Sequence, residues 1–366
     1  MRLGVAAALV EGALLPGDVE VADGRVAAVG LGEPRGEKIA VPGFVDLQVN
    51  GYAGVDFSAP GEEGYAVAGA ALLAAGVTAF QPTIVTAGLE SMLDSLARVP
   101  TVDPGPRLIG AHLEGPFLSR DQAGAHRANA VLPPDPEALE RLLAAGPVSQ
   151  MTLAPELPGA LALVDALVAR GVTVSCGHTD ANAAAAHLAF EHGAIAVTHV
   201  FNSMRSFRSR DAGIAFAGLG REDVFVSAIV DGHHLAPDTV RVLWRAAGDR
   251  LVLISDAVAA AAAPDGRYTL GGIVAIHSAE GVVRTDQGSL AGSTLSMAEA
   301  VRNAHALGMS PAAALTAATE APARMARRPD LGRIEPGGRA DIVVLDDTLR
   351  VERVLLGGEE PVARTG

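Results

Sequence analysis

Four side chains of the sequence have the chemistry of a hydrolytic metal centre. Glu114, His178 and His199 supply one carboxylate and two imidazoles, and three such ligands leave a coordination position of a catalytic divalent metal free for water. Asp256 is the candidate base that takes a proton from this water and later returns it to the leaving group. Each of the four lies at the end of a short apolar run, so the elements that carry these runs decide whether the side chains meet.

Apolar, β-branched runs alternate with alanine- and leucine-rich segments through the middle of the chain. Eight runs are candidate strands: 43–48, 78–83, 108–114, 150–154, 173–177, 195–199, 224–230 and 251–255. Helical segments separate most of them: 64–75, 136–145, 161–170, 181–192 and 237–247. Because the runs are continuously apolar, as in a parallel sheet buried on both faces, they predict a (β/α)8 barrel of the TIM type. A doubly wound open sheet is the competing fold, and the absence of G-x-G-x-x-G after the first strand disfavours it.

Both ends of the chain predict short strands instead. They fall at 3–9, 18–22, 25–29, 341–345 and 351–356, with the hairpin signal Asp23-Gly24 between the second and third. We expect residues 1–42 and 325–366 to form one small β-sandwich domain beside a metal-dependent catalytic barrel of residues 43–324. Two unrelated terminal hairpins are the alternative.

Nearly every predicted barrel strand ends in a polar or titratable side chain. These are Gln48 and Asn50, Gln81, His112 and Glu114, Glu156, His178, His199, Asp231 with His233 and His234, and Asp256. Active sites of such barrels are built at the C-terminal ends of the strands, where side chains from different strands converge. We therefore expect one site at this face.

The chain resembles the N-acetylglucosamine-6-phosphate deacetylase family of the amidohydrolase superfamily over essentially its whole length. The matching segments are PGFVDLQVNG (42–51), HLEGPFL (112–118), GAH (124–126), GHTDA (177–181), THVFNSM (198–204), DGHH (231–234), SDA (255–257) and AGSTLSM (291–297). The resemblance implies metal-dependent hydrolysis of N-acetyl-D-glucosamine 6-phosphate to D-glucosamine 6-phosphate and acetate. It makes Glu114, His178 and His199 the metal ligands and Asp256 the catalytic acid and base.

Neutral amides stand where the superfamily often has His-x-His on the first strand to hold a second metal. Gln48 and Asn50 are poor transition-metal ligands beside imidazole, so we expect them to mark a vestigial second-metal position. We expect one divalent metal per subunit, with Zn²⁺ as first choice and Fe²⁺ as alternative. Lys38 is the only lysine and lies near the N-terminus, which argues against a metal-bridging carbamylated lysine.

The resemblance also implies contacts to the substrate. His126 matches the histidine that polarises the amide carbonyl and contacts the sugar, although its alternative is an ordinary loop histidine. Asn202, Arg210 and His234 match positions that bind the sugar or its phosphate, and a guanidinium suits a phosphate dianion. A solvated, arginine-rich loop is the alternative for Arg210, and His233 leaves the assignment within its pair open. In the family the neighbouring subunit completes the phosphate site, which implies a homodimer.

Composition excludes several other classes of protein. With 28 basic against 42 acidic side chains the formal net charge is −14, and no basic stripe with interleaved aromatics predicts nucleic-acid binding. No apolar stretch is long enough for a membrane span, and the lone Cys176 excludes a disulfide framework, so we expect a cytoplasmic protein.

Two other functions stay open at this point. One is a deacetylase of a related substrate, either N-acetylgalactosamine 6-phosphate or an N-acyl amino acid. The other is a non-catalytic sugar-phosphate sensor on the same fold. The segment 266–288 predicts β-hairpins that either cover the site as a lid or decorate the barrel rim.

Overall fold

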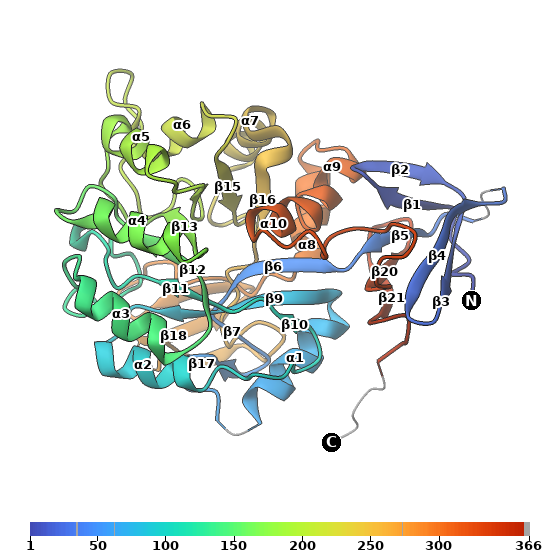
Figure 1. Ribbon diagram of the computed structural model, residues 1–366, viewed down its shortest axis with the longest axis horizontal. Helices are drawn as coiled ribbons and strands as arrows, with labels where there is room; N and C mark the ends of the chain where they lie inside the picture. Colours follow the sequence, from blue (N-terminus) through green and yellow to red (C-terminus); the bar gives the residue numbers. More distant parts are fainter. Residues whose placement is uncertain (34–35, 62, 273, 362–366) are drawn as a thin grey trace.

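The computed structural model describes residues 1–33, 36–61, 63–272 and 274–361 (Figure 1). Eight parallel strands follow one another around a nearly closed barrel. They are β6 (Phe44–Val49), β9 (Val77–Val85), β11 (Ala111–Glu114), β12 (Val148–Leu153), β13 (Thr173–Cys176), β14 (Ala196–Val197), β15 (Phe225–Ala228) and β16 (Leu251–Leu253). Backbone contacts of Val49 and Asn50 with Ala257 bring the first and last strands together. The predicted (β/α)8 barrel is confirmed.

Helices cover the outside of the barrel, as a parallel sheet buried on both faces requires. They are α1 (Gly64–Ala74), α2 (Leu89–Ala97), α3 (Pro136–Ala145), α4 (Ala160–Ala169), α5 (Ala183–Glu191), α6 (Gly213–Leu219), α7 (Pro237–Ala247), α8 (Met297–Ala306), α9 (Pro311–Thr316) and α10 (Glu320–Met325), with 3₁₀ turns η1 (Arg120–Gln122) and η2 (Gly248–Arg250).

Local sequence explains where several helices begin. The carboxylate of Asp135 accepts the backbone N–H of Glu137 ahead of α3, and the side chain of Asn182 caps α5 in the same way. At α8, Ser296 and Glu299 form a reciprocal capping box. These caps satisfy backbone donors that would otherwise have no partner in the first helical turn.

The two ends of the chain share one five-stranded sheet. Across it lie β2 (Ala13–Pro16), β1 (Ala7–Val10), β5 (Ile39–Pro42), β20 (Ile342–Leu345) and β21 (Val351–Leu355). A hairpin of β3 (Asp18–Ala22) and β4 (Arg25–Leu31) packs on this sheet, and Val19 and Val26 share a core with Ala40 and Ile342. The composite terminal sandwich is therefore present, and two unrelated terminal hairpins are excluded. The domain division of residues 1–42 and 325–366 from 43–324 stays a prediction.

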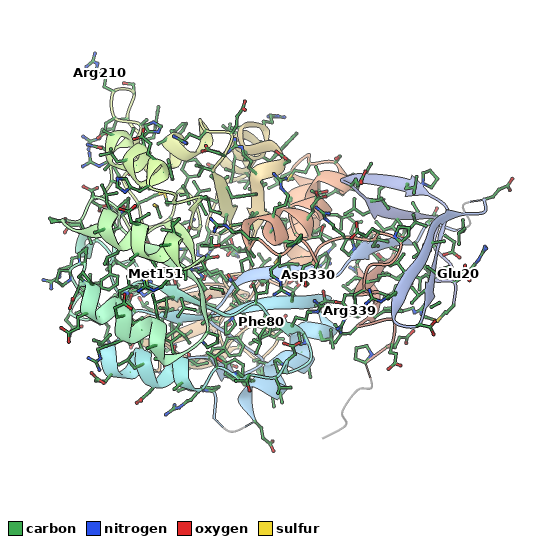
Figure 2. The ribbon with its side chains drawn as sticks, viewed as in Figure 1. Glu20, Phe80, Met151, Arg210, Asp330 and Arg339 are labelled. Atoms are coloured by element: carbon green, nitrogen blue, oxygen red, sulfur yellow. The ribbon has the colours of Figure 1, made fainter. Side chains whose placement is uncertain are left out.

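Three small features surround the C-terminal face of the barrel. The first is a hairpin of β7 (Gly51–Tyr52) and β8 (Val55–Asp56). The two-residue strand β10 (Arg107–Leu108) lies elsewhere, since it pairs with Ala79 and Phe80 in the N-terminal half of β9. The second is an antiparallel sheet of β17 (Gly266–Leu270), β18 (Val274–Ala279) and β19 (Val282–Thr285). The third is a loop between β14 and α6 that stands out from the molecule and carries Arg210 at its tip (Figure 2).

Polar side chains join five neighbouring strands in the barrel interior. A ring nitrogen of His112 lies 2.8 Å from the hydroxyl of Thr152, which in turn lies 2.8 Å from the hydroxyl of Thr198. Ser175 and Thr83 extend this chain of contacts at its two ends. Burial lowers the pKa of His112 to about 4, so its ring is neutral. His112 thus lies inside the barrel and links strands, while Glu114, two residues on, enters the site.

The described part of the chain contains no helix with the length and apolar character needed to cross a membrane.

Candidate active site

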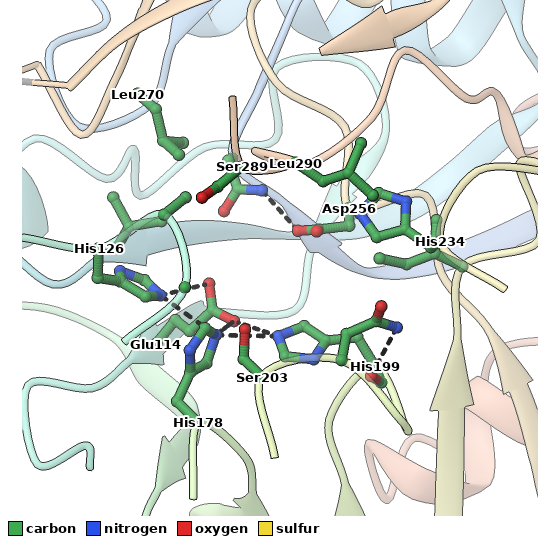
Figure 3. A pocket seen from close by; sticks show the side chains of 17 residues that line it. Glu114, His126, His178, His199, Ser203, His234, Asp256, Leu270, Ser289 and Leu290 are labelled. Carbon is green, nitrogen blue, oxygen red and sulfur yellow. Dashed lines mark hydrogen bonds and ion pairs between the residues drawn. The ribbon is translucent and has the colours of Figure 1, made fainter. Parts of the chain in front are cut away.

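The barrel brings the three predicted metal ligands together. Glu114 ends β11, His178 follows β13 and His199 follows β14, and all three are buried (Figure 3). Oε1 of Glu114 lies 2.9 Å from Nε2 of His199 and 3.2 Å from Nε2 of His178. The two imidazole nitrogens lie 3.1 Å from each other. Three potential ligand atoms from three strands therefore face one point.

Hydrogen bonding of His178 shows that this point suits a cation. Nδ1 of His178 lies 2.9 Å from the carbonyl oxygen of Gln122, which can only accept, so Nδ1 carries the proton. In the neutral ring Nε2 then directs a lone pair toward the carboxylate of Glu114, a repulsive contact unless a positive ion lies between them. An N–H to a backbone carbonyl on the far side of the ring is also the usual support of a metal-bound histidine. The residues present fit a divalent metal ion.

The pKa of Glu114 agrees with a role as an ionised ligand. Burial raises this pKa, but the imidazoles of His178 and His199 beside the carboxylate outweigh the effect of burial. The net result is a pKa well below the ordinary range of a glutamate, so Glu114 is a carboxylate near neutral pH.

Backbone conformation directs several site residues into the pocket. His178, His199 and Asp256 have φ values of 48°, 29° and 50°, in the left-handed region that side-chain-bearing residues rarely adopt. Such conformations cost free energy and concentrate where a function requires them. All three residues lie two or three positions after the end of a barrel strand, where a change in backbone direction turns the side chain over the end of the barrel.

Asp256 lies across the pocket from the histidines and is held by two amides. Its Oδ1 accepts hydrogen bonds from Nδ2 of Asn50 at 2.7 Å and Nε2 of Gln48 at 3.1 Å. The same Nε2 of Gln48 lies 3.0 Å from Oε1 of Glu114, so this amide lies between the two carboxylates. Burial and the charge of Glu114 raise the pKa of Asp256 to about 6, a value suited to proton transfer near neutral pH.

His126 is the third imidazole of this cluster. Its Nε2 lies 3.3 Å from Nε2 of His178 and 3.6 Å from Oε2 of Glu114. Burial, reinforced by the neighbouring imidazole of His178, lowers the pKa of His126 to about 3, so the ring is neutral and can donate a single N–H. The His126 ring lines the same pocket as the three predicted metal ligands. The role beside the reacting carbonyl that the family resemblance implies for it stays a prediction.

The pocket itself is a cavity of about 310 Å³. At its other side lies His234, whose Nδ1 is 2.7 Å from Oδ2 of Asp231. Oδ1 of Asp231 accepts the backbone N–H groups of His233 and His234. Burial raises the pKa of Asp231, but the hydrogen bond with the His234 side chain, followed by these backbone bonds, holds the pKa below its ordinary value. Asp231 thereby fixes the imidazole of His234 by its Nδ1, and among the described residues no hydrogen bond engages Nε2, which faces the pocket.

A family model described as the amidohydrolase family matches residues 39–361. The chain belongs to the amidohydrolase family. It is 39% identical to the N-acetylglucosamine-6-phosphate deacetylase of Mus musculus, over 88% of this chain and 83% of that protein. It is 37% identical to the N-acetylgalactosamine-6-phosphate deacetylase of Escherichia coli O157:H7, over 95% and 96% of the two chains.

Solved structures agree with these relatives. A mutant of N-acetyl-D-glucosamine-6-phosphate deacetylase from Mycobacterium smegmatis, in complex with N-acetyl-D-glucosamine-6-phosphate, is 38% identical and superposes with a TM-score of 0.93 over 98% of both chains. The corresponding enzyme from Thermotoga maritima is 31% identical, with a TM-score of 0.91 over 98% and 99% of the two chains. The resemblance inferred from sequence motifs is confirmed, and the amidohydrolase is an enzyme of this deacetylase group.

The remaining predicted contacts lie in different places. Asn202 lines the pocket, but its amide donates to the backbone carbonyls of His199 and Val200. Arg210 is not among the residues that line the pocket in the described part of this amidohydrolase, because the protruding loop carries it away from the cavity (Figure 2). Arg205 lies at the base of that loop, where it pairs with Asp180 and Asp211. The phosphate role of Arg210 stays a prediction.

Two acidic residues of the amidohydrolase were not predicted to support the site. Asp46 lies inside β6, and its Oδ1 accepts the backbone N–H groups of Ser255 and Gln48. Ser255 precedes Asp256 in the chain, and Gln48 is one of the two amides that donate to Asp256. The signal for Asp46 was a carboxyl within a buried strand whose other residues, apart from Gln48, are apolar. Asp231 was recognised as a strand end, but its support of His234 depends on a turn that no periodicity predicts.

Proposed function

We propose that this amidohydrolase hydrolyses N-acetyl-D-glucosamine 6-phosphate to D-glucosamine 6-phosphate and acetate. The observation that carries the proposal is the buried set of Glu114, His178 and His199 facing Asp256 across one pocket. The two relatives from mouse and M. smegmatis bear the name of this activity, and both cover most of the chain.

Glu114, His178 and His199 would hold one divalent metal per subunit, and we propose Zn²⁺, with Fe²⁺ as the alternative for this donor set. When bound, such an ion supplies Lewis acidity that lowers the pKa of water and polarises the amide carbonyl. Gln48 and Asn50 occupy the second-metal position of the superfamily, yet here their amide N–H groups donate to Asp256. This use of the amides supports a site for a single metal.

Asp256 performs both proton transfers of the proposed reaction. As a carboxylate it takes a proton from the water that attacks the acetyl carbon, and the neutral ring of His126 donates its N–H to the developing oxyanion. The protonated Asp256 then gives its proton to the leaving nitrogen as the carbon–nitrogen bond breaks. Acetic acid and the free amine result, the acid passes its proton to the amine or to water to become acetate, and the carboxylate of Asp256 is restored.

His234 and Asn202 face the sugar phosphate at the other side of the pocket. We propose that a second copy of the chain supplies Arg210, because the protruding loop presents this arginine away from its own pocket (Figure 2). A homodimer would then bring a guanidinium to the phosphate dianion, since no arginine lines the pocket among the described residues. We also propose a cytoplasmic location, in keeping with the single, buried Cys176.

Acetate release from N-acetylglucosamine 6-phosphate tests the function. The unphosphorylated sugar and the galactosamine epimer are assayed in parallel, and the metal content is determined on the same sample. We expect release that depends on the phosphate, with one metal per chain. A metal-loaded protein that releases no acetate from the phosphorylated glucosamine substrate would refute the proposal.

The Asp256→Asn variant tests the proposed proton transfers. It keeps an acceptor for the amides of Gln48 and Asn50 but cannot carry the proton, so we expect loss of turnover with metal content unchanged. Turnover retained by this variant contradicts the role of Asp256.

A further inference from the structure

A leucine at the tip of a β-hairpin forms part of the pocket wall. Leu270 is the last residue of β17, lines the pocket and is 5% exposed. It belongs to an apolar cluster that also contains Val85, and Ala125 packs against the same cluster. Val85 pairs in register with the metal ligand Glu114, and Ala125 precedes His126 in the chain. These three side chains make one continuous apolar surface beside the reacting groups.

The carboxylate of Asp56 holds this hairpin in place. Its Oδ2 accepts the backbone N–H of Gly272 at 2.8 Å and the hydroxyl of Thr269 at 3.3 Å, on either side of Leu270. Its Oδ1 accepts the backbone N–H of Ser58 at 2.9 Å. The β7–β8 hairpin is thus tied to the β17–β18 hairpin by a buried carboxylate, which fixes the depth to which Leu270 enters the pocket.

The proposed reaction determines which part of the substrate meets this surface. The carbonyl carbon of the amide carries an oxygen, a nitrogen and the acyl group. The oxygen points toward His126 and the metal ligands, and the nitrogen toward Asp256, with the sugar phosphate beyond it at His234. Figure 3 places Leu270 on the side of His126 and away from His234. The acyl group is the substituent left to face the apolar surface.

We infer that Leu270, with Val85 and Ala125, forms the acyl-binding wall that restricts the enzyme to short acyl groups, and that Asp56 keeps this wall closed. The inference rests on the proposed deacetylase function and specifies its substrate further. One added methylene in an apolar pocket changes specificity by about 10- to 200-fold. The wall therefore predicts a preference for acetyl over longer acyl chains.

The test compares N-acetyl-, N-propionyl- and N-butyryl-glucosamine 6-phosphate as substrates of the wild type and Leu270→Ala. We expect the propionyl-to-acetyl ratio of kcat/KM to rise at least about tenfold in the variant, because the side chain that meets the added methylene is removed. Leu290→Ala is the matched control, since Leu290 also lines the pocket but lies near Asp256 and His234 (Figure 3). Its ratio is expected to stay within about twofold of the wild type, since its side chain does not meet the acyl group.

A binding measurement separates the acyl wall from effects on chemistry. In the Asp256→Asn background, calorimetry measures Kd for the acetyl and butyryl substrates with and without Leu270→Ala. We expect the Kd for the butyryl compound to fall in the double variant while the Kd for the acetyl compound rises. Asp56→Ala, which frees the hairpin, is expected to raise the propionyl-to-acetyl ratio in the same direction.

The possible outcomes distinguish this inference from the proposed function. A wild type without activity on any of the three substrates refutes the deacetylase function itself. An active wild type whose acyl preference is unchanged by Leu270→Ala overturns the acyl wall, as does an equal change in Leu290→Ala. If Leu270→Ala fails to fold, Leu270→Val provides the same comparison, and an unchanged ratio in that variant also overturns the inference.

Discussion

Asp46 predicts an unusual pH dependence of stability. The side chain is 1% exposed inside the barrel, and among the described residues its Oδ2 has no hydrogen-bond partner. Burial raises the pKa of Asp46 to about 7, although its Oδ1 accepts backbone N–H groups from Ser255 and Gln48. In the unfolded chain the same carboxyl has its ordinary pKa of 3.8. Between these two values the folded protein binds a proton that the unfolded chain has lost.

The sign and size of the effect follow from linkage. Because the folded-state pKa is raised, the contribution is fully present below about pH 4 and is lost as the pH rises toward 7. The free energy of unfolding falls by at most about 1.4 kcal/mol per pH unit in this window. Between pH 5 and pH 7 it falls by about 2 kcal/mol, because the slope has halved at the folded-state pKa of about 7. Asp46→Asn keeps a similar shape and stays neutral, so it lacks this dependence.

The assay is urea unfolding of metal-free wild type and Asp46→Asn at pH 5, 6, 7 and 8, followed by the fluorescence of Trp244, the single tryptophan. Other groups titrate in both proteins, so the difference between their free energies of unfolding isolates Asp46. We expect this difference to shift by about 2 kcal/mol against the wild type between pH 5 and pH 7. A difference that is constant over this range refutes the reasoning that Asp46 is protonated in the folded barrel.

Two further predictions concern the pocket. Asp231→Asn removes the charge that faces Nδ1 of His234, so we expect KM for the phosphorylated sugar to rise about tenfold with a smaller change in kcat. Steady-state kinetics on the phosphorylated and unphosphorylated sugars measure this effect. A chelator is expected to abolish acetate release by removing the ion from Glu114, His178 and His199, and one equivalent of Zn²⁺ per chain to restore it. Metal analysis and acetate release are followed together.

Each of these predictions has a result that contradicts it. If Asp231→Asn raises KM equally for the phosphorylated and the unphosphorylated sugar, the pair of Asp231 and His234 has no specific part in recognising the phosphate. Full activity in a sample that is almost free of metal would exclude the metal centre as the source of activity. Recovery that needs two equivalents would contradict the single site expected from Gln48 and Asn50.

The barrel was predictable because its strands are buried on both faces. Such strands read as continuous apolar runs, and all eight lie where the sequence places them, although β14 is reduced to Ala196–Val197 within the predicted 195–199. In the terminal sandwich, a single strand is predicted at 3–9. The structure instead has β1 from Ala7 to Val10 and a second strand, β2, from Ala13 to Pro16. Turns built on glycines with positive φ, among them Gly4 and Gly12, divide this region in a way that apolar content does not indicate.

The site was predictable in its residue types and less so in its contacts. Glu114, His178, His199 and Asp256 meet because parallel strands end at one face of the barrel. The outward position of Arg210 and the support given by Asp231 depend on loop conformations instead. Side-chain spacing in the sequence carries no information on such conformations, since each loop is fixed by its own backbone hydrogen bonds.

The sheet shared by the two ends of the chain sets an order for biosynthesis. Val41 of β5 pairs with Val343 of β20, and a ribosome needs about 15–60 s to make the residues between them at about 5–20 residues per second. The barrel strands emerge one after another during this time, while one edge of β5 waits for a partner. A chain interrupted before β20 therefore exposes an unpaired sheet edge, the kind of surface that promotes aggregation. Completion of synthesis is thus coupled to the covering of this edge, and truncated copies differ from finished ones by a surface that chaperones and proteases can recognise.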